Sequence, residues 1–301
     1  MNLTTSINNL FGLLNFRRSG PAQSFKGFFD LYFKKYSDDQ RVTGGRGEVF
    51  IVGAGPGDPE LLTLKAHRLI QSADVVLFDW LVSEDLLRLI PASATRQFVG
   101  KRCGQHSFEQ QTICNLMVEH ARLGRKVVRL KGGDPSVFGR VSEECDALQN
   151  ANIPYAIVPG ITAASGMAAY SGMPLTDRRY AQSVRFITAT LKNPEDEPDW
   201  SGMVTQSGKS QDTLVFYMGL KRIGTIAQRL ISHGMKADMA CAVVDQATQQ
   251  QQQIITGNLR NIADLVAAKV IEGPALLVVG EVTQQPWSVD LALLHKEHIT
   301  F

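Results

Sequence analysis

Apolar positions in the first part of the chain follow two alternating patterns. Short runs of valine, isoleucine and leucine predict buried strands at residues 48–54, 73–78, 95–99, 126–130 and 155–158. Between these runs, apolar residues recur every three to four positions and predict helices at residues 61–72, 83–90, 108–123, 142–150 and 162–170, with Ser83 as an N-cap. Such alternation is typical of a parallel sheet covered by helices on both faces.

The same alternation continues after a linker near residue 176. Strands are expected at residues 184–188, 213–218, 241–245 and 275–279, and helices at residues 223–233 and 262–270. The polar stretch 192–211 is expected to be an exposed loop, and the glutamine run 249–253 a hairpin or surface loop. We therefore expect an α/β protein with mostly parallel sheets flanked by helices, in two domains, residues 48–176 and 177–284, with a tail at 285–301.

The first 47 residues lack this pattern. Residues 24–36 (SFKGFFDLYFKKY) are aromatic and basic, and form either a short amphipathic helix or part of a flexible extension, which we favour. No apolar run approaches the roughly 20 residues that a membrane span needs, and no secretory signal is evident.

Composition narrows the functional classes. The chain has 301 residues, 44% of them hydrophobic, enough for one large core or two ordinary ones. Its 31 Lys plus Arg residues against 29 Asp plus Glu residues give a net charge of +2, without the basic excess of a nucleic-acid-binding protein. The four scattered cysteines fit reduced thiols in the cytoplasm. Cys103 and His106 alone are a weak zinc signal, so no metal is implied.

Three glycine-rich turns follow predicted strands, at residues 53–58, 131–135 and 159–164. In parallel sheets, ligands bind beyond the carboxyl ends of the strands. The first turn is a poor dinucleotide fingerprint, because its spacing is GxGxG and Pro56 interrupts the turn into the helix. By itself it is equally consistent with a purely structural turn. Thr162, in the third turn, is placed to cap a helix.

Taken together, the motifs are more specific. The segments VGAGPGDPELLTLKA, LFDWLVS, VGKRCGQHSFEQ, VVRLKGGDPSVFGR, VPGITAASGMAAYSGMPLT and FYMGL resemble the uroporphyrinogen-III C-methyltransferases of the tetrapyrrole methylase family, which occur alone or as the methylating half of siroheme synthase. The resemblance implies a homodimeric fold of two domains with the active site between them. It also implies S-adenosylmethionine as cofactor, S-adenosylhomocysteine as its product, and two methyl transfers to uroporphyrinogen III, at C2 and C7, giving precorrin-2 via precorrin-1.

The resemblance also assigns roles to residues. Its cofactor contacts correspond to Pro56, Gly132, Gly133, Asp134, Val137, Thr162, Ala163, Met218, Ala247 and Ala275. Asp79 and Lys101 correspond to the proton acceptor and proton donor. A base is needed because a pyrrole carbon that attacks the methyl group becomes a cation and must lose a proton. Lys101 fits equally well as a group that holds Asp79 or a substrate carboxylate.

The substrate carries eight carboxylates, which guanidinium groups bind bidentately. Among the arginines in or beside the motifs, Arg102 and Arg140 are the expected substrate ligands. Either substrate binding or ordinary surface pairing fits the remaining three, Arg129, Arg178 and Arg179. The chain departs from the family pattern at Val141, Asp177, Ala189, Thr190 and Ala247. Most of these departures bear on the substrate side of the site.

Other functions compete with this interpretation. A methylase of a later precorrin is the nearest alternative. An NAD-dependent oxidoreductase is suggested only by the first glycine turn, and a non-catalytic tetrapyrrole-binding protein only by changes in the second domain. The first 47 residues are too few for the dehydrogenase and chelatase module of siroheme synthase, so methylation alone is expected. Whether the product leads to siroheme, cobalamin or another modified haem stays open.

Overall fold

A computed structural model describes residues 47–100, 110–191, 193, 196–204, 212–271, 273–284 and 287–294. Three parts of the sequence analysis lie outside the described residues: residues 1–46 of the expected extension, Lys101 and Arg102, and the part of the polar stretch 192–211 that follows residue 204. None of the described helices is long and apolar enough to cross a membrane.

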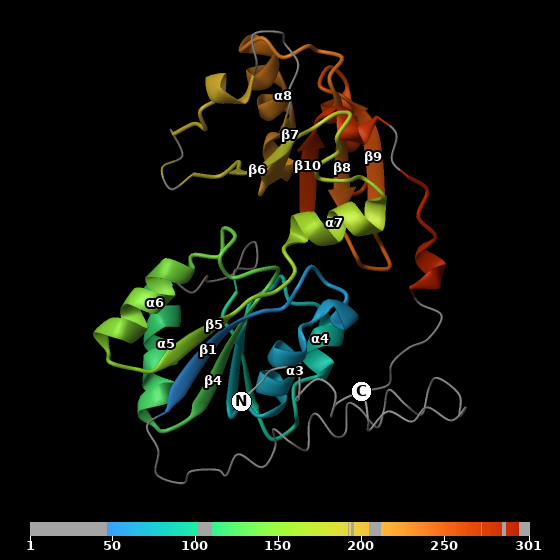
Figure 1. Ribbon diagram of the computed structural model, residues 1–301. Coiled ribbons are helices and arrows are strands. Elements are labelled where there is room, and N and C mark those ends of the chain that lie inside the picture. Colours follow the sequence, from blue (N-terminus) through green and yellow to red (C-terminus); the bar gives the residue numbers. More distant parts are fainter. Residues whose placement is uncertain are drawn as a thin grey trace, which may run out of the picture. The chain divides into compact units, whose positions relative to one another are not determined.

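The first sheet is entirely parallel, as predicted, and its strand order is β3-β2-β4-β1-β5 (Figure 1). Its strands are β1 (Glu48–Gly53), β2 (Val75–Phe78), β3 (Thr95–Phe98), β4 (Lys126–Lys131) and β5 (Tyr155–Val158). The central strands β1, β2 and β4 are buried along most of their length, because helices cover both faces of the sheet.

The helices of this part divide between the two faces of the sheet. On one face, α3 (Leu64–Gln71) and α4 (Glu84–Arg88) pack over side chains that include Val128 and Leu130 of β4. On the other face, α5 (Gln110–Arg122) and α6 (Val141–Asn150) pack over Val127 of β4. Ser83 caps α4 as predicted, since its side chain accepts a hydrogen bond from the Leu86 N–H.

The second sheet has the order β6-β7-β10-β8-β9 and differs from the sequence prediction. Its strands are β6 (Ser183–Thr188), β7 (Asp212–Tyr217), β8 (Ala240–Asp245), β9 (Gln253–Asn258) and β10 (Ala275–Val279). Only β6 and β7 pair in parallel, whereas the other three pairings are antiparallel. The expectation of mostly parallel sheets therefore holds for the first sheet alone.

Strand β9 was not predicted, because Ile255 is its only buried residue and no apolar run marks it. The glutamine-rich segment before it connects β8 to β9, which pair antiparallel, and this confirms the hairpin interpretation. This hairpin loop comprises residues 246–252.

Helices also cover both faces of the second sheet. One face packs against α8 (Ile223–Ser232) and α9 (Ile262–Ala267). The opposite face packs against α7 (Ala163–Ser171), through Ala164 and Met167. Helix α7 thus precedes the predicted boundary at residue 176 but packs on the later sheet, and the division into residues 48–176 and 177–284 stays a prediction. Short 3₁₀ turns occupy Pro59–Leu61, Ser201–Met203, Leu220–Arg222, Glu281–Thr283 and Leu291–Leu293.

Candidate active site

The turns after β1, β4 and β5 meet through their glycines. Gly55 and Gly133 exchange two backbone hydrogen bonds, 3.1 Å from Gly55 N to Gly133 O and 2.7 Å in return. A Cβ added at Gly53 would lie 2.6 Å from Gly160 N and 2.7 Å from Gly133 O. Side chains at these positions would force the three turns apart, so the glycines are required for the close approach.

The Asp134 side chain links the second glycine turn to the third by a hydrogen bond. Its Oδ2 accepts a hydrogen bond of 3.0 Å from Gly160 N, and its Oδ1 accepts one of 2.8 Å from Ser136 N. Val137 continues the same turn, with its N–H donating to the Asp134 carbonyl. The Asp134 carboxylate is thus engaged by backbone N–H groups at both oxygens and sets the shape of the turns.

The backbone at Gly133 faces the start of α7. Its φ is +68°, in the left-handed region that glycine tolerates. A Cβ added there would have only two neighbouring atoms within 4 Å among the described residues, Ala163 N at 3.7 Å and Thr162 Cα at 4.0 Å. Three predicted cofactor contacts from two different turns therefore face one another.

Tyr217, at the end of β7, connects the second sheet to this group. Its hydroxyl lies 2.8 Å from Thr162 Oγ1 and accepts a hydrogen bond of 3.1 Å from Ala164 N. Burial raises the pKa of Tyr217, so the phenol stays protonated at neutral pH. The next residue, Met218, has a φ of +56° and is 53% exposed. Tyr217 lies in the FYMGL segment, but no local pattern in the sequence marks it for this contact.

The hairpin loop reaches the first glycine turn. Asp58 N donates to Thr248 Oγ1 at 3.2 Å, and a Cβ added at Gly166 of α7 would lie 2.5 Å from Pro56 Cγ. Ala247, beside Thr248, belongs to the same apolar cluster as Ala164 of α7.

Tyr170 of α7 also contacts the first glycine turn, because its hydroxyl donates a hydrogen bond of 2.5 Å to Asp58 Oδ2. On the other side of the hairpin loop, Gln246 N donates to Pro274 O, immediately before Ala275. The predicted contacts Pro56, Ala247 and Ala275 are thus linked through the hairpin loop.

Asp79 follows β2 at the same edge of the first sheet. Its Oδ2 lies 3.1 Å from Arg129 Nη2, and its Oδ1 accepts a hydrogen bond of 3.1 Å from Leu81 N. The carboxylate is held at both oxygens, but 18% of its side chain remains exposed. A Cβ added at Gly132 would lie 2.5 Å from Leu81 Cβ, so the turn carrying Asp79 abuts the second glycine turn. A proton acceptor at this place is accessible and fixed in orientation.

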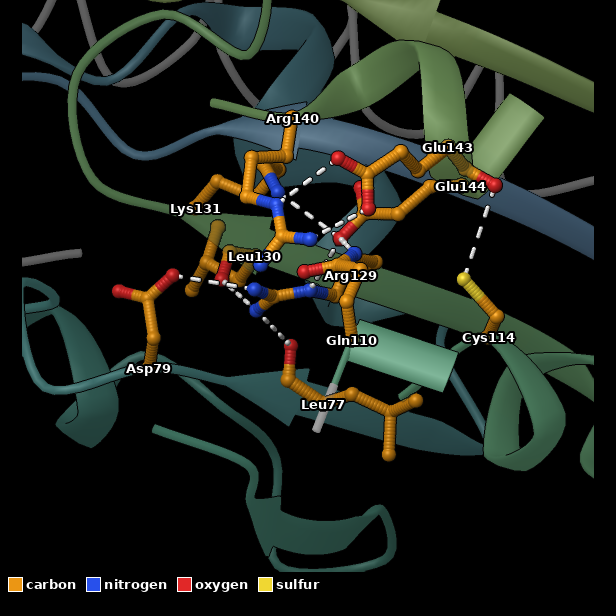
Figure 2. Close-up of polar contacts among 10 residues, drawn as sticks. All are labelled: Leu77, Asp79, Gln110, Cys114, Arg129, Leu130, Lys131, Arg140, Glu143 and Glu144. Atoms are coloured by element: carbon orange, nitrogen blue, oxygen red, sulfur yellow. Dashed lines mark hydrogen bonds and ion pairs between the residues drawn. The ribbon is translucent and has the colours of Figure 1, made fainter. Parts of the chain in front are cut away.

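Behind Asp79 lies a buried charge network of four residues, Asp79, Arg129, Lys131 and Glu144 (Figure 2). Glu144 Oε1 lies 3.2 Å from Arg129 Nε and 2.8 Å from Lys131 Nζ. Burial, followed by the nearby Arg129 charge, lowers the pKa of Lys131. The sequence left Arg129 open between substrate binding and surface pairing, but the structure buries it and pairs it with Asp79 and Glu144.

Three further arginines near the motifs are exposed, namely Arg140, Arg178 and Arg179. Arg140, the residue before α6, forms a bidentate pair with Glu143, at 2.9 Å and 2.5 Å. Arg179 pairs with Asp177 at 2.8 Å, and its hydrogen bonds lower the pKa of Asp177 to about 2. Arg178 is exposed. Surface pairs such as these exchange partners at little cost, so Arg140 remains able to bind a substrate carboxylate.

The chain is similar to known proteins over most of its length. Residues 48–263 match the family described as Tetrapyrrole (Corrin/Porphyrin) Methylases. A siroheme synthase from Pseudomonas aeruginosa strain UCBPP-PA14 is 49% identical over 82% of this chain and 53% of its own length. The chain thus spans about half the length of the curated relatives it matches.

Two solved structures are similar over most of their own length. The uroporphyrin-III C-methyl transferase from Thermus thermophilus, complexed with S-adenyl homocysteine, is 37% identical with a TM-score of 0.66, over 79% of this chain and 94% of that one. A cobalt precorrin-4 methyltransferase from cobalamin biosynthesis is 28% identical with a TM-score of 0.69, over 79% and 96% of the respective chains.

Proposed function

Because this chain belongs to the tetrapyrrole methylases, we propose that it transfers methyl groups from S-adenosylmethionine to C2 and C7 of uroporphyrinogen III. The product would be precorrin-2, formed through precorrin-1. The observation that carries the proposal is the convergence of three glycine turns beside Asp79, in a chain similar to a uroporphyrin-III C-methyl transferase that was solved with S-adenyl homocysteine.

The residues at the glycine turns fit the cofactor. Among the described residues, no side chain covers the Gly133 backbone, which lies opposite Thr162 and Ala163. Met218 follows Tyr217, whose hydroxyl contacts Thr162. We propose Gly133, Thr162, Ala163 and Met218 as cofactor contacts, together with the remaining predicted ones, Pro56, Gly132, Asp134, Val137, Ala247 and Ala275. When bound, S-adenosylmethionine supplies an activated methyl group on a sulfonium centre.

Asp79 is the proposed proton acceptor. The methylated pyrrole carbon must lose its proton to restore the ring, and Asp79 offers a carboxylate with both oxygens fixed and part of its surface open. Lys101 and Arg102 lie outside the described residues, and their proposed roles rest on the motif alone. Arg140 is proposed to exchange Glu143 for a substrate carboxylate. Fixed positioning of reacting groups can supply roughly 7–11 kcal/mol of the barrier reduction.

The experiment is incubation with uroporphyrinogen III and isotopically labelled S-adenosylmethionine, followed by mass analysis. We expect a product that carries two labelled methyl groups, and an Asp79→Asn variant that binds S-adenosylhomocysteine but forms little product. Asp85→Asn changes an exposed carboxylate on α4 in the same way and serves as the matched control. Absence of labelled product from the wild-type chain contradicts the proposal.

Similarity to a cobalt precorrin-4 methyltransferase supports one alternative, a methylase that acts on a later precorrin. The same assay with a later precorrin separates the two substrates. We further propose a cytoplasmic homodimer. The free thiols of Cys114, Cys145 and Cys241 support the reducing compartment, and light scattering of the purified chain tests the dimer.

A further inference from the structure

A fully buried carboxylate stands behind the proposed proton acceptor. Glu144 of α6 has no exposed surface, although glutamate is rarely buried without a partner. Its Oε1 accepts from Arg129 Nε at 3.2 Å, from Lys131 Nζ at 2.8 Å and from Gln110 Nε2 at 3.3 Å (Figure 2). Glu144 therefore organises the inner end of the buried charge network.

Arg129 connects Glu144 to Asp79, because its guanidinium contacts both carboxylates. Its guanidinium contacts Glu144 through Nε, donates to the Leu130 carbonyl through Nη1 at 2.9 Å, and contacts Asp79 Oδ2 through Nη2 at 3.1 Å. A guanidinium is planar and its donors diverge at fixed angles. With one edge fixed by Glu144, the other edge fixes the place of the Asp79 carboxylate.

The form of the network argues for a role beyond stability. Buried ion pairs contribute little net stability compared with apolar residues of similar volume, because each charge must leave water. This network has equal numbers of cationic and anionic groups, and it ends on a partly exposed carboxylate at the carboxyl edge of the sheet. If the network served packing alone, it would not need to include a partly exposed carboxylate at the edge of the sheet.

We propose that Glu144 is a positioning residue for the methylation reaction, acting through Arg129 to hold Asp79 where it takes the proton. The inference rests on the proposed function of Asp79. Lys131 is a second cation on Glu144 Oε1, at 2.8 Å, so the two carboxylates of Glu144 and Asp79 together match the two cations of the network.

The test is a double-mutant cycle between Glu144 and Asp79. Glu144→Gln keeps the shape of the side chain and removes its charge, and misplacement of a catalytic group costs up to about a hundredfold in rate. We expect kcat to fall by about tenfold or more, with KM and the affinity for S-adenosylhomocysteine within twofold of wild type. Asp146→Asn, an exposed carboxylate on the same helix, is the matched control and should behave as wild type.

The decisive readout is the combined variant. If Glu144 acts through Asp79, adding E144Q to D79N causes no further loss of kcat, whereas a merely structural role lowers kcat in both backgrounds. A crystal structure of E144Q gives a readout without turnover, because the Asp79 carboxylate should be displaced from its wild-type place.

The remaining outcomes are distinct. Wild-type kcat in E144Q, or equal losses in both backgrounds, overturns the inference and leaves the proposed function standing. A wild-type chain that binds S-adenosylhomocysteine but does not methylate overturns both. If E144Q does not fold, Arg129→Lys replaces it in the same cycle, since an ammonium cannot bridge Glu144 and Asp79 as the guanidinium does.

Discussion

The hydroxyl groups of Tyr217 and Thr162 lie 2.8 Å apart, although 55 positions separate them in the chain. The contact joins the end of β7 to the residue that precedes α7, and the Tyr217 ring packs on Phe138 at 5.0 Å between centroids. Tyr217 therefore connects the second sheet to the third glycine turn and to Phe138, which follows the second turn, at the place proposed for the cofactor.

Tyr217→Phe should weaken cofactor binding, because its hydroxyl contacts Thr162 at the proposed cofactor site. Removing the hydroxyl leaves Thr162 Oγ1 and Ala164 N without this partner, and a buried polar group without a partner costs about 1–3 kcal/mol. We expect the Kd for S-adenosylhomocysteine to rise about fivefold to a hundredfold in calorimetry. Tyr180→Phe, in the linker, is the control. Unchanged affinity in Tyr217→Phe would show that the hydroxyl does not shape the site.

Gly160→Ala should disrupt the meeting of the three turns. The added Cβ would overlap the Gly133 carbonyl oxygen and come within 2.9 Å of the Gly53 backbone, neither of which can move without moving a strand end. We expect a lower Tm and no measurable S-adenosylhomocysteine binding. Gly224→Ala is the matched control, because the nearest atom to its added Cβ is Ala263 Cβ at 3.7 Å, within a helix where alanine is favoured. Normal binding by Gly160→Ala would refute the packing argument.

Tyr170→Phe should lower stability without abolishing methylation. Burial, reinforced by the Asp58 carboxylate, raises the pKa of Tyr170, so its hydroxyl keeps the proton that it donates to Asp58. Hydrogen bonds to charged groups contribute about 1.5–3 kcal/mol. Urea unfolding should therefore show a lower midpoint with an unchanged slope. A midpoint equal to that of wild type would mean that the contact contributes nothing to the folded state.

The pKa of Asp177 should depend on Arg179 and not on Arg178. Arg179 holds that pKa at about 2, below its ordinary value of 3.8, through side-chain and backbone hydrogen bonds. A depressed carboxyl pKa stabilises the folded state above the ordinary value, and this contribution is lost as the pH falls through about 2. Carboxyl NMR titration should show the pKa of Asp177 rising in Arg179→Ala and staying low in Arg178→Ala.

The local patterns in the sequence were sufficient for most of the elements. The strand at Tyr155–Val158 and the capping by Ser83 agree with the prediction, because both depend on neighbouring residues. Strand β9 was missed because only one of its side chains is buried. The pairing directions in the second sheet were also missed, because a run of apolar residues marks a strand without giving the direction of its neighbours.

Part of the candidate site could not be predicted from the sequence either. The glycine turns were recognisable, since glycine at a strand end is a local signal. Arg129 and Lys131 stand at alternate positions of β4, whose intervening residues are apolar after Lys126, and this could have marked them as buried charges on one face. Their partner Glu144 and the contact between Tyr217 and Thr162 depend on the packing of distant segments, which no local pattern encodes.

The place of β1 in the sheet has a consequence for biosynthesis. This strand leaves the ribosome before its neighbours, yet Glu48 pairs with Lys126 and Val49 with Tyr155, so both adjoining strands are translated much later. Until β4 and β5 are translated, the apolar strand β1 has no neighbouring strand to pair with, whereas β2 and β3 can already pair with each other. Unpaired apolar strands invite association with other chains. Nascent fragments that stop short of β4 should therefore aggregate, or bind chaperones, far more readily than fragments that include β5.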